Sequence, residues 1–338
     1  RLDGLPLAIE LAASRVGVLS PIELLERLDD RFSVLTGSRR RRGRDRQRTL
    51  EQTIDWSFEM LDASDRTAFA RLAVFAGSFD LPAAAAVLRA DELDALDVLE
   101  LLVDRSLLAI DDHPSGRRYR YLETIRAYAE RCLDDSGASE DALEALHRHL
   151  VAAMPELLKR FMGDMKTEAA RLERETPNLH RAFNWAIERN DPSAATALVR
   201  PLANLVGMVV WPIHGWADDV IALPGVAGSD DEPMLLVLQA VDRHLDNRFD
   251  EMKRISLSVL DLDHTPRPIP DAMWQPLSLM LNLIGRDDIT RELLSERSAA
   301  GMRRWDDVGV AMYLAVQDRA SMDELHVEML ATLGAGEC

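Results

Sequence analysis

The densest group of side chains that could do chemistry is a run of arginines at residues 38–48, SRRRRGRDRQR. It holds seven arginines against one aspartate, a local charge of +6, so the rest of the chain carries −24 where the whole carries −18. Guanidinium groups neutralise the phosphates of nucleic acids. The candidate nucleic-acid contacts are therefore Arg39, Arg40, Arg41 and Arg42. A solvated hinge is the alternative, because like charges at this density repel one another.

Histidines are the next group that could hold a ligand, since imidazole is a common metal ligand. His147 and His149 lie two positions apart, and His113 precedes them in the chain. Residues i and i+2 of a helix face different ways, and no cysteine or histidine lies at the spacing of a metal site. We predict solvated histidines and no metal. No serine, cysteine or carboxylate pair has a recognisable catalytic context, so we expect no enzymatic activity of this chain.

The composition is that of an ordinary globular protein. Hydrophobic residues make up 47% and charged residues 29% of the 338 residues, which suits two or three domains with cores of their own. Aromatic residues are only 5%, and abundant alanine, leucine, arginine and carboxylates favour helices. The net charge of −18 argues against general binding to nucleic acid, which needs a positive surface.

Cysteine content and apolar segments indicate a cytoplasmic protein. Cys132 and Cys338 are too few for a disulfide framework. The first residues lack the basic-then-apolar layout of a signal peptide. The longest apolar stretch, near residues 202–213, falls short of the about 20 residues that a membrane helix needs, so no membrane span is expected.

Residues 49–137 have the element order of a winged-helix domain. TLEQTIDWSFEML is amphipathic, Asp62 and Asp65 are predicted to cap the next helix, and a further helix begins at Pro82. After a helix that ends near Ser106, SLLAID and RRYRYL alternate around a Pro/Gly turn, which indicates a β-hairpin wing. A last helix stops at Gly137.

From residue 138 to the end, the sequence predicts helices joined by loops. Three stretches read as an apolar helix, a polar turn and a second helix, which is entered at Phe249, Arg286 and Met322, at spacings of 37 and 36 residues. This spacing is close to the period of a tetratricopeptide repeat, which is about 34 residues. We predict a helical bundle over 138–230 and degenerate TPR-like repeats over 231–338, stacked as an α-solenoid.

Four tryptophans lie in this arm, at Trp211, Trp216, Trp274 and Trp305. Repeat arms present concave surfaces where aromatic side chains can bind a ligand or a partner. Burial in the core is the alternative for all four.

Six segments follow one another along the first part of the chain: GLPLAIELAA (4–13), RLDDRF (27–32), RQRTLEQTIDWS (46–57), LAVFAGSFDL (72–81), LVDRSLL (102–108) and YRYLETIRAYA (119–129). In this order they resemble the STAND signal-transduction NTPases. ERETPNLHRAFNWAIE (173–188) is similar to the first helices of the sensor arm in such proteins. The nearer resemblance is to bacterial regulators that join an NB-ARC-type ATPase core to a LuxR-type DNA-binding domain or an adenylate cyclase domain.

The resemblance implies nucleotide contacts at particular residues. Gly4, Leu5 and Pro6 match the motif whose proline packs on adenine, although a proline that merely starts a helix is the alternative. Leu122 and Glu123 fall where the family senses the β-phosphate. A leucine side chain cannot donate a hydrogen bond, and the alternative for Glu123 is that it caps the following helix.

The sequence contains no GxxxxGK[ST] motif, whose backbone N–H groups and lysine hold phosphates. We therefore expect no cofactor in this chain, and expect ATP or ADP to bind the ATPase core of a parent protein. Residues 1–37 are then the helical end of that core, and 38–48 a linker. In that setting the arginine run could contact the nucleotide or an acidic face of the core.

The predicted fold is thus mainly α, with a small hairpin wing, and the predicted function is regulatory. The winged-helix domain holds the core at rest, and the arm receives a protein or small-molecule signal that releases it. A separate effector domain binds DNA. The alternative is a stand-alone winged-helix DNA-binding protein with a dimerising arm. An enzyme with an unrecognised site in the arm and a degenerate scaffold are further alternatives.

Overall fold

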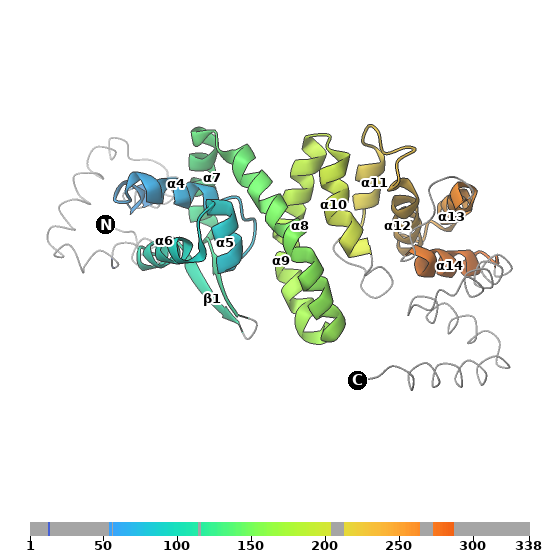
Figure 1. Cartoon of the computed structure of the whole chain (residues 1–338), viewed down its shortest axis with the longest axis horizontal. Coiled ribbons are helices and arrows are strands. Elements are labelled where there is room, and N and C mark those ends of the chain that lie inside the picture. Colours follow the sequence, from blue (N-terminus) through green and yellow to red (C-terminus); the bar gives the residue numbers. More distant parts are fainter. Residues whose placement is uncertain are drawn as a thin grey trace, which may run out of the picture. The chain divides into compact units, whose positions relative to one another are not determined.

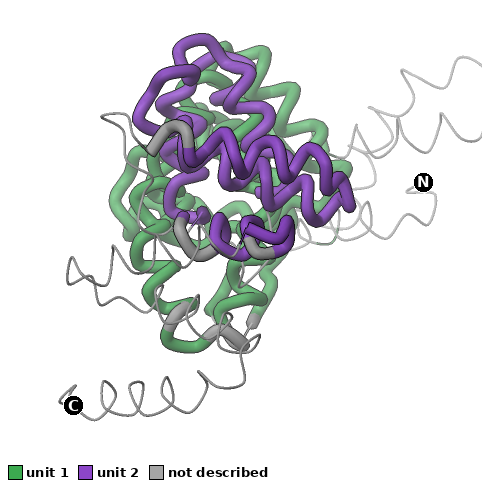
Figure 2. The backbone as a smooth tube through the Cα atoms, turned by 90° about the vertical axis from the view of Figure 1, so that its right-hand side faces the viewer, with its two compact units in different colours: residues 1–185 green, residues 186–338 purple. Residues whose placement is uncertain are grey.

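The computed structural model describes Ala13 and residues 54–55, 57–113, 116–203, 213–263 and 273–286. These residues are mainly helical, with one small sheet, as the sequence predicts (Figure 1). The chain divides into two compact units, residues 1–185 and 186–338 (Figure 2). The finer domain boundaries inferred from the sequence remain predictions.

The first unit contains a run of short helices, a hairpin and three longer helices. Their bounds are α4 Ala63–Leu72, α5 Leu81–Leu88, α6 Glu92–Asp104, β1 Ala109–His113, β2 Gly116–Arg120, α7 Glu123–Ser136, α8 Ser139–Gly163 and α9 Met165–Glu188. The last residues of α9 already belong to the second unit. The order of three helices, a hairpin and a helix is that of a winged-helix domain.

Three successive helices begin at an aspartate whose carboxylate accepts backbone N–H groups of the first turn. Asp62 accepts from the N–H of Asp65 at 2.8 Å, and Asp80 from that of Ala83 at 3.1 Å. Asp91 accepts from two N–H groups of α6, each at 2.9 Å. These caps satisfy donors that have no partner within the helix, so local sequence determines where each helix begins.

Phenylalanines form the centre of the winged-helix core. Phe69, Phe75 and Phe79 are buried, and the rings of Phe75 and Phe79 stack with centroids 4.2 Å apart. Tyr121 adds its ring against Phe69 and donates its hydroxyl to the carbonyl of Phe69 at 2.6 Å. The buried hydroxyl is thereby satisfied, which removes the cost of its desolvation.

The wing is an antiparallel hairpin in which Ile110 pairs with Tyr119 and Asp112 with Arg117. Phe79 adds a third, one-residue strand: its N–H and carbonyl bond to Tyr119 at 2.9 and 2.7 Å. The hairpin predicted from the alternating residues is present, but β1 begins only at Ala109. Leu107 and Leu108 stay buried in the core ahead of the strand.

The second unit is helical throughout the part that the structure describes. Its helices are α10 Pro192–Ala203, α11 Trp216–Ile221, α12 Glu232–Leu245, α13 Phe249–Asp263 and α14 Trp274–Leu283. α12 and α13 form the first predicted helix pair, and α14 packs on both. The later repeats, beyond residue 286, lie outside the described residues. Among the described residues, no helix combines the length and apolar character needed to cross a membrane.

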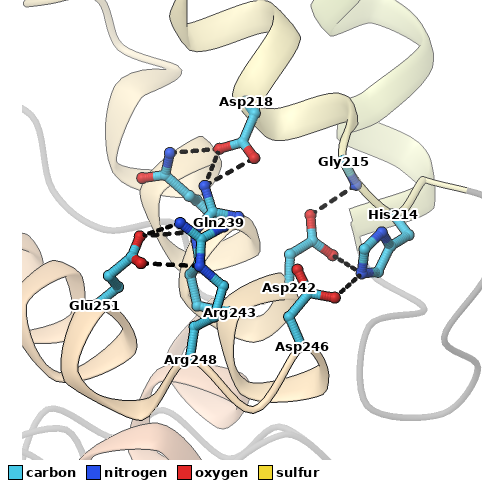
Figure 3. A network of polar contacts seen from close by, with 9 residues as sticks. All are labelled: His214, Gly215, Asp218, Gln239, Asp242, Arg243, Asp246, Arg248 and Glu251. Carbon is cyan, nitrogen blue, oxygen red and sulfur yellow. Dashed lines mark hydrogen bonds and ion pairs between the residues drawn. The ribbon is translucent and has the colours of Figure 1, made fainter.

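A network of charged side chains joins α11, α12 and the start of α13 (Figure 3). Asp218 accepts from Arg243 at 2.7 and 2.8 Å and from Gln239 at 2.6 Å. Burial opposes the charge of Asp218, but these donors outweigh it and lower the pKa of its carboxyl. The other side of Arg243 faces Glu251 at 3.4 Å, and Arg248 also binds Glu251. Alternating charges thus tie three helices together.

Asp242 is the most buried carboxylate of this network, with only 7% of its surface exposed. It accepts from the N–H of Gly215 at 2.9 Å, where a φ of 82° favours glycine. His214 lies 3.9 Å from Asp242 and 3.2 Å from Asp246 (Figure 3). Burial dominates, and it raises the pKa of Asp242.

We expect Asp91→Ala to lower the free energy of unfolding by about 1 kcal/mol, because two N–H groups of α6 lose their acceptor. Urea denaturation at neutral pH measures this loss. Asp97→Ala, an exposed position within the same helix, is the matched control. An equal loss in both variants would mean that helix charge rather than capping is responsible.

The raised pKa of Asp242 predicts a pH-dependent difference between the protein and its Asp242→Asn variant. A carboxyl whose folded pKa lies above its unfolded value stabilises the fold below the unfolded pKa, and this contribution is lost as pH rises through the folded pKa. The variant, which keeps an oxygen for the Gly215 N–H, should therefore gain in melting temperature relative to the unmodified protein as pH rises from about 4 to 7. Asp246→Asn is the control and should show a smaller change.

Candidate functional site

Most of the residues predicted from the sequence to bind ligands lie outside the described residues. These are Gly4, Leu5, Pro6, Arg39, Arg40, Arg41 and Arg42. Their nucleotide and nucleic-acid contacts stay predictions. The two residues at the expected sensor position, Leu122 and Glu123, are described.

Leu122 and Glu123 lie at the start of α7. Leu122 is the half-buried N-cap residue, and its side chain makes no capping hydrogen bond. The prediction that Glu123 caps the helix is wrong: Glu123 is exposed in the first turn, and its carboxylate accepts from Arg126 at 2.8 Å instead. A negative charge there is favourable to the helix dipole. Arg126 also binds Glu130 at 2.9 Å, so Glu123 belongs to a surface row of charges along α7.

α6 occupies the place of the helix that helix-turn-helix proteins insert into the major groove, directly before the wing. Its exposed residues include five carboxylates and no basic side chain: Glu92, Asp94, Asp97, Glu100 and Asp104. Leu93 beside them is 72% exposed. Such a face repels the phosphates of DNA.

The arginines of the wing are largely engaged within the protein. Arg117 binds Asp112 across the hairpin at 3.0 Å, with both side chains mostly exposed. Arg118 is buried, with only 4% of its surface exposed. Arg120 is the exposed arginine at the end of β2. The wing therefore offers little free positive charge.

The loop before α5 is joined to α9 through Asn178, which is 1% exposed. The side-chain oxygen of Asn178 accepts from the N–H of Gly77 at 3.0 Å, and its amide nitrogen donates to the carbonyl of Ser78 at 2.8 Å. A Cβ at Gly77 would lie 3.2 Å from two carbons of Pro177. α9 thus approaches this loop so closely that a side chain at residue 77 would have to displace Pro177 by a few tenths of an ångström.

Arg118 of the wing connects the same loop to α9. Its Nε donates to the hydroxyl of Ser78 at 2.8 Å and its Nη2 to the carbonyl of Ser78 at 2.6 Å. Its Nη1 donates to Glu175 at 2.6 Å. Glu175 also accepts from Asn178 at 3.2 Å. We call these residues, Gly77, Ser78, Arg118, Glu175 and Asn178, the wing–α9 junction.

The junction is a charge pair removed from water. The side chains of Arg118 and Glu175 are 5% and 16% exposed. A buried ion pair is a weak source of net stability, but removal of one partner costs about 3–5 kcal/mol, because the other charge is left unpaired. The arrangement therefore fixes one geometry rather than adding much stability.

α8 is tied to the other side of the winged-helix domain. Asp141 accepts from Arg71 of α4 at 2.7 Å, and Arg89 after α5 binds the same carboxylate. These arginines lower the pKa of Asp141. Arg71 also donates twice to the carbonyl of Val87, at 2.9 and 2.8 Å. One arginine thus joins three helices.

The histidines of α8 are half-buried rather than solvated, so that part of the sequence prediction is wrong. His147 lies against Trp185 of α9, with ring centroids 5.2 Å apart. Burial lowers the pKa of His149, with Asp80 and Glu175 opposing the shift. Within the described part of the chain, no three acidic, histidine or cysteine side chains gather as a metal site would require.

Trp216 of the arm is only 3% exposed, which agrees with burial in the core. The side chains of Trp211, Trp274 and Trp305 lie outside what the structure describes, so for them both interpretations stay predictions.

Sequence reasoning missed the wing–α9 junction, although it singled out both segments that meet there. Gly77 and Ser78 belong to LAVFAGSFDL, and Glu175 and Asn178 belong to ERETPNLHRAFNWAIE. The available signal was the pair Gly77 and Pro177, residue types that often mark special backbone positions. Nothing local to Arg118 distinguishes it from its exposed neighbours Arg117 and Arg120.

Comparison with known proteins agrees with this architecture. Residues 61–134 match the family described as a winged helix-turn-helix domain. A Mycobacterium tuberculosis protein named as an HTH-type transcriptional regulator, Rv0890c, is 43% identical over 206 residues, 60% of this chain and 23% of that protein. An uncharacterized M. tuberculosis protein, Rv0894, is 41% identical over 154 residues, 44% of this chain and 39% of its own.

The regulatory protein AfsR of Streptomyces coelicolor is 35% identical over 157 residues, 43% of this chain and 15% of that protein. No solved structure matches the chain. The chain spans less than a quarter of the length of Rv0890c and of AfsR. It therefore contains a winged helix-turn-helix domain and is related in sequence to part of larger bacterial transcriptional regulators.

Proposed function

We propose that this chain is the regulatory and sensor part of a STAND-type, ATP-dependent transcriptional regulator. Its winged-helix domain holds an adjoining NB-ARC-type nucleotide core at rest, and its helical arm receives a protein or small-molecule signal. DNA is bound by a separate domain, such as a LuxR-type one, and ATP or ADP by the core. The chain itself acts in the cytoplasm, without catalysis.

One observation carries the proposal: the winged-helix surface suits contact with protein better than reading of DNA. The five exposed carboxylates lie on the helix that would enter the major groove. Two of the three wing arginines are held by Asp112 and Glu175. Over residues 61–134, fourteen carboxylates oppose nine arginines, a net charge of −5. An electrostatic footprint for nucleic acid needs the opposite sign.

Relatives named as transcriptional regulators support a role in regulation, although the chain covers only part of each. The order of the resembling segments supports the STAND assignment, with Pro6 as adenine contact. Leu122 offers no hydrogen-bond donor for a phosphate, so nucleotide sensing at Leu122 and Glu123 has no support from the geometry.

The second candidate is a stand-alone winged-helix DNA-binding protein with a dimerising arm. The match to a winged helix-turn-helix family and the arginine run at 38–48 favour it. In that case Arg39 to Arg42 would neutralise phosphates beside the domain.

DNA binding separates the two candidates. We expect the full chain to bind a fluorescent DNA duplex negligibly in 50 mM salt by anisotropy, and replacement of Arg39 to Arg42 by glutamine to change nothing. A triple variant, Asp94→Lys, Asp97→Lys and Glu100→Lys, should raise the affinity about tenfold or more, because it reverses the charge of the α6 face.

Tight, salt-dependent binding by the unmodified chain, abolished by neutralising Arg39 to Arg42, would favour the second candidate. If the triple lysine variant also fails to bind, the acidic face of α6 is not what prevents DNA binding. The acidic surface of the domain would then no longer support the proposal.

The gene tests the STAND assignment directly. We expect the coding DNA upstream of Arg1 to contain an in-frame GxxxxGK[ST] motif about 200–250 residues earlier, the usual size of such a core. A start codon immediately before Arg1 would exclude such an upstream motif and contradict the assignment.

A further inference from the structure

We propose that Arg118 fixes α9 to the wing, so that the winged-helix domain, α8 and α9 as far as Trp185 turn as one rigid body. The inference rests on the proposed function only in naming the arm as the source of the signal. In this arrangement the signal reaches the winged-helix domain as a displacement of α9, and the wing–α9 junction stays closed throughout.

The first argument is that all three guanidinium nitrogens of the buried Arg118 donate hydrogen bonds, and the acceptors belong to two separate elements. Nε, Nη1 and Nη2 of Arg118 each donate at 2.6 to 2.8 Å. The acceptors belong to the loop before α5 and to α9, while Arg118 itself belongs to β2. A lysine, a single ammonium on a flexible stem, could not reproduce this fork of donors.

The second argument is that the ties are spread along the domain rather than concentrated at one pivot. Asn178 holds Gly77 and Ser78, and Asp141 of α8 holds Arg71 and Arg89. Trp185 near the end of this body donates to Glu140 at the start of α8. A body held at several separated places resists bending at any one of them.

The third argument concerns what would happen if α9 moved away from the loop and the wing. Withdrawal of α9 would separate Arg118 from Glu175, and Asn178 from Gly77 and Ser78, so three hydrogen bonds would be lost together. Signalling by detachment of α9 would require this loss in each cycle, whereas movement of the intact body does not.

Hydrogen exchange of the full chain tests the role of Arg118. In Arg118→Ala we expect amide exchange in residues 76–79 and 174–180 to accelerate about tenfold or more. Protection in α4 and α7 should stay close to that of the unmodified chain. Arg118→Lys should lie between the two, because it keeps the charge facing Glu175 and loses the bonds to Ser78.

Arg117→Ala is the matched control, since Arg117 is the neighbouring arginine but binds only the exposed Asp112. It should leave exchange at 174–180 unchanged. If Arg118→Ala loses its helical circular dichroism, Gly77→Ala replaces it: the added Cβ presses on Pro177 without removing a charge. The same segments should then lose protection.

Spin labels measure whether the body is rigid, a property that stability alone does not reveal. Arg120 and Glu173 are exposed positions on the wing and on α9. With Cys132 and Cys338 replaced by serine, labelled cysteines at these positions should give one narrow distance distribution. Arg118→Ala in the same background should broaden it.

Equal exchange in Arg118→Ala and Arg117→Ala, or a broad distance distribution with Arg118 present, would overturn the proposal. Either result concerns only the joint between wing and α9. DNA binding and the upstream gene decide the proposed function separately, so failure of one does not carry failure of the other.

Discussion

A guanidinium removed from water constrains this structure more than any other group. Arg118 cannot lose its charge, so each of its donors must find an acceptor within the protein. Ser78 and Glu175 accept three hydrogen bonds from it, one from each guanidinium nitrogen. The carbonyl of Ser78 also accepts from Asn178, so the loop, the wing and α9 fix one another's positions. Two helices, α8 and α9, thus continue the winged-helix domain and share its polar contacts.

The distribution of charge determines which partners the surface of the winged-helix domain can bind. Arg71 and Arg118 are mostly buried and bind carboxylates within the protein, while exposed carboxylates remain on α6. The same fold that presents a basic helix to DNA in other proteins therefore presents an acidic one. Fold and function separate at this point, because function depends on the side chains displayed on a common scaffold.

The second unit also joins its helices by ion pairs, but these are more exposed to solvent. Arg243 between Asp218 and Glu251 resembles the junction in alternating charge, but its network is open to solvent on one side. Burial raises the pKa of Asp242, and this shift is opposed by the hydrogen bond from the N–H of Gly215 and by the nearby His214 and Arg243. Such a network positions helices while it remains sensitive to protonation.

The sequence by itself determined the elements of the winged-helix domain. Aspartates at 62, 80 and 91 mark helix starts, Gly137 ends α7 with a φ of 70°, and alternation around a Pro/Gly turn indicates the wing. Local alternation also predicts that one face of β2 meets solvent. Yet Arg118 and Tyr119 are both buried, on opposite faces. Only tertiary structure decided this, because the second face is covered by Glu175, 57 residues away in sequence, and no local pattern contains that contact.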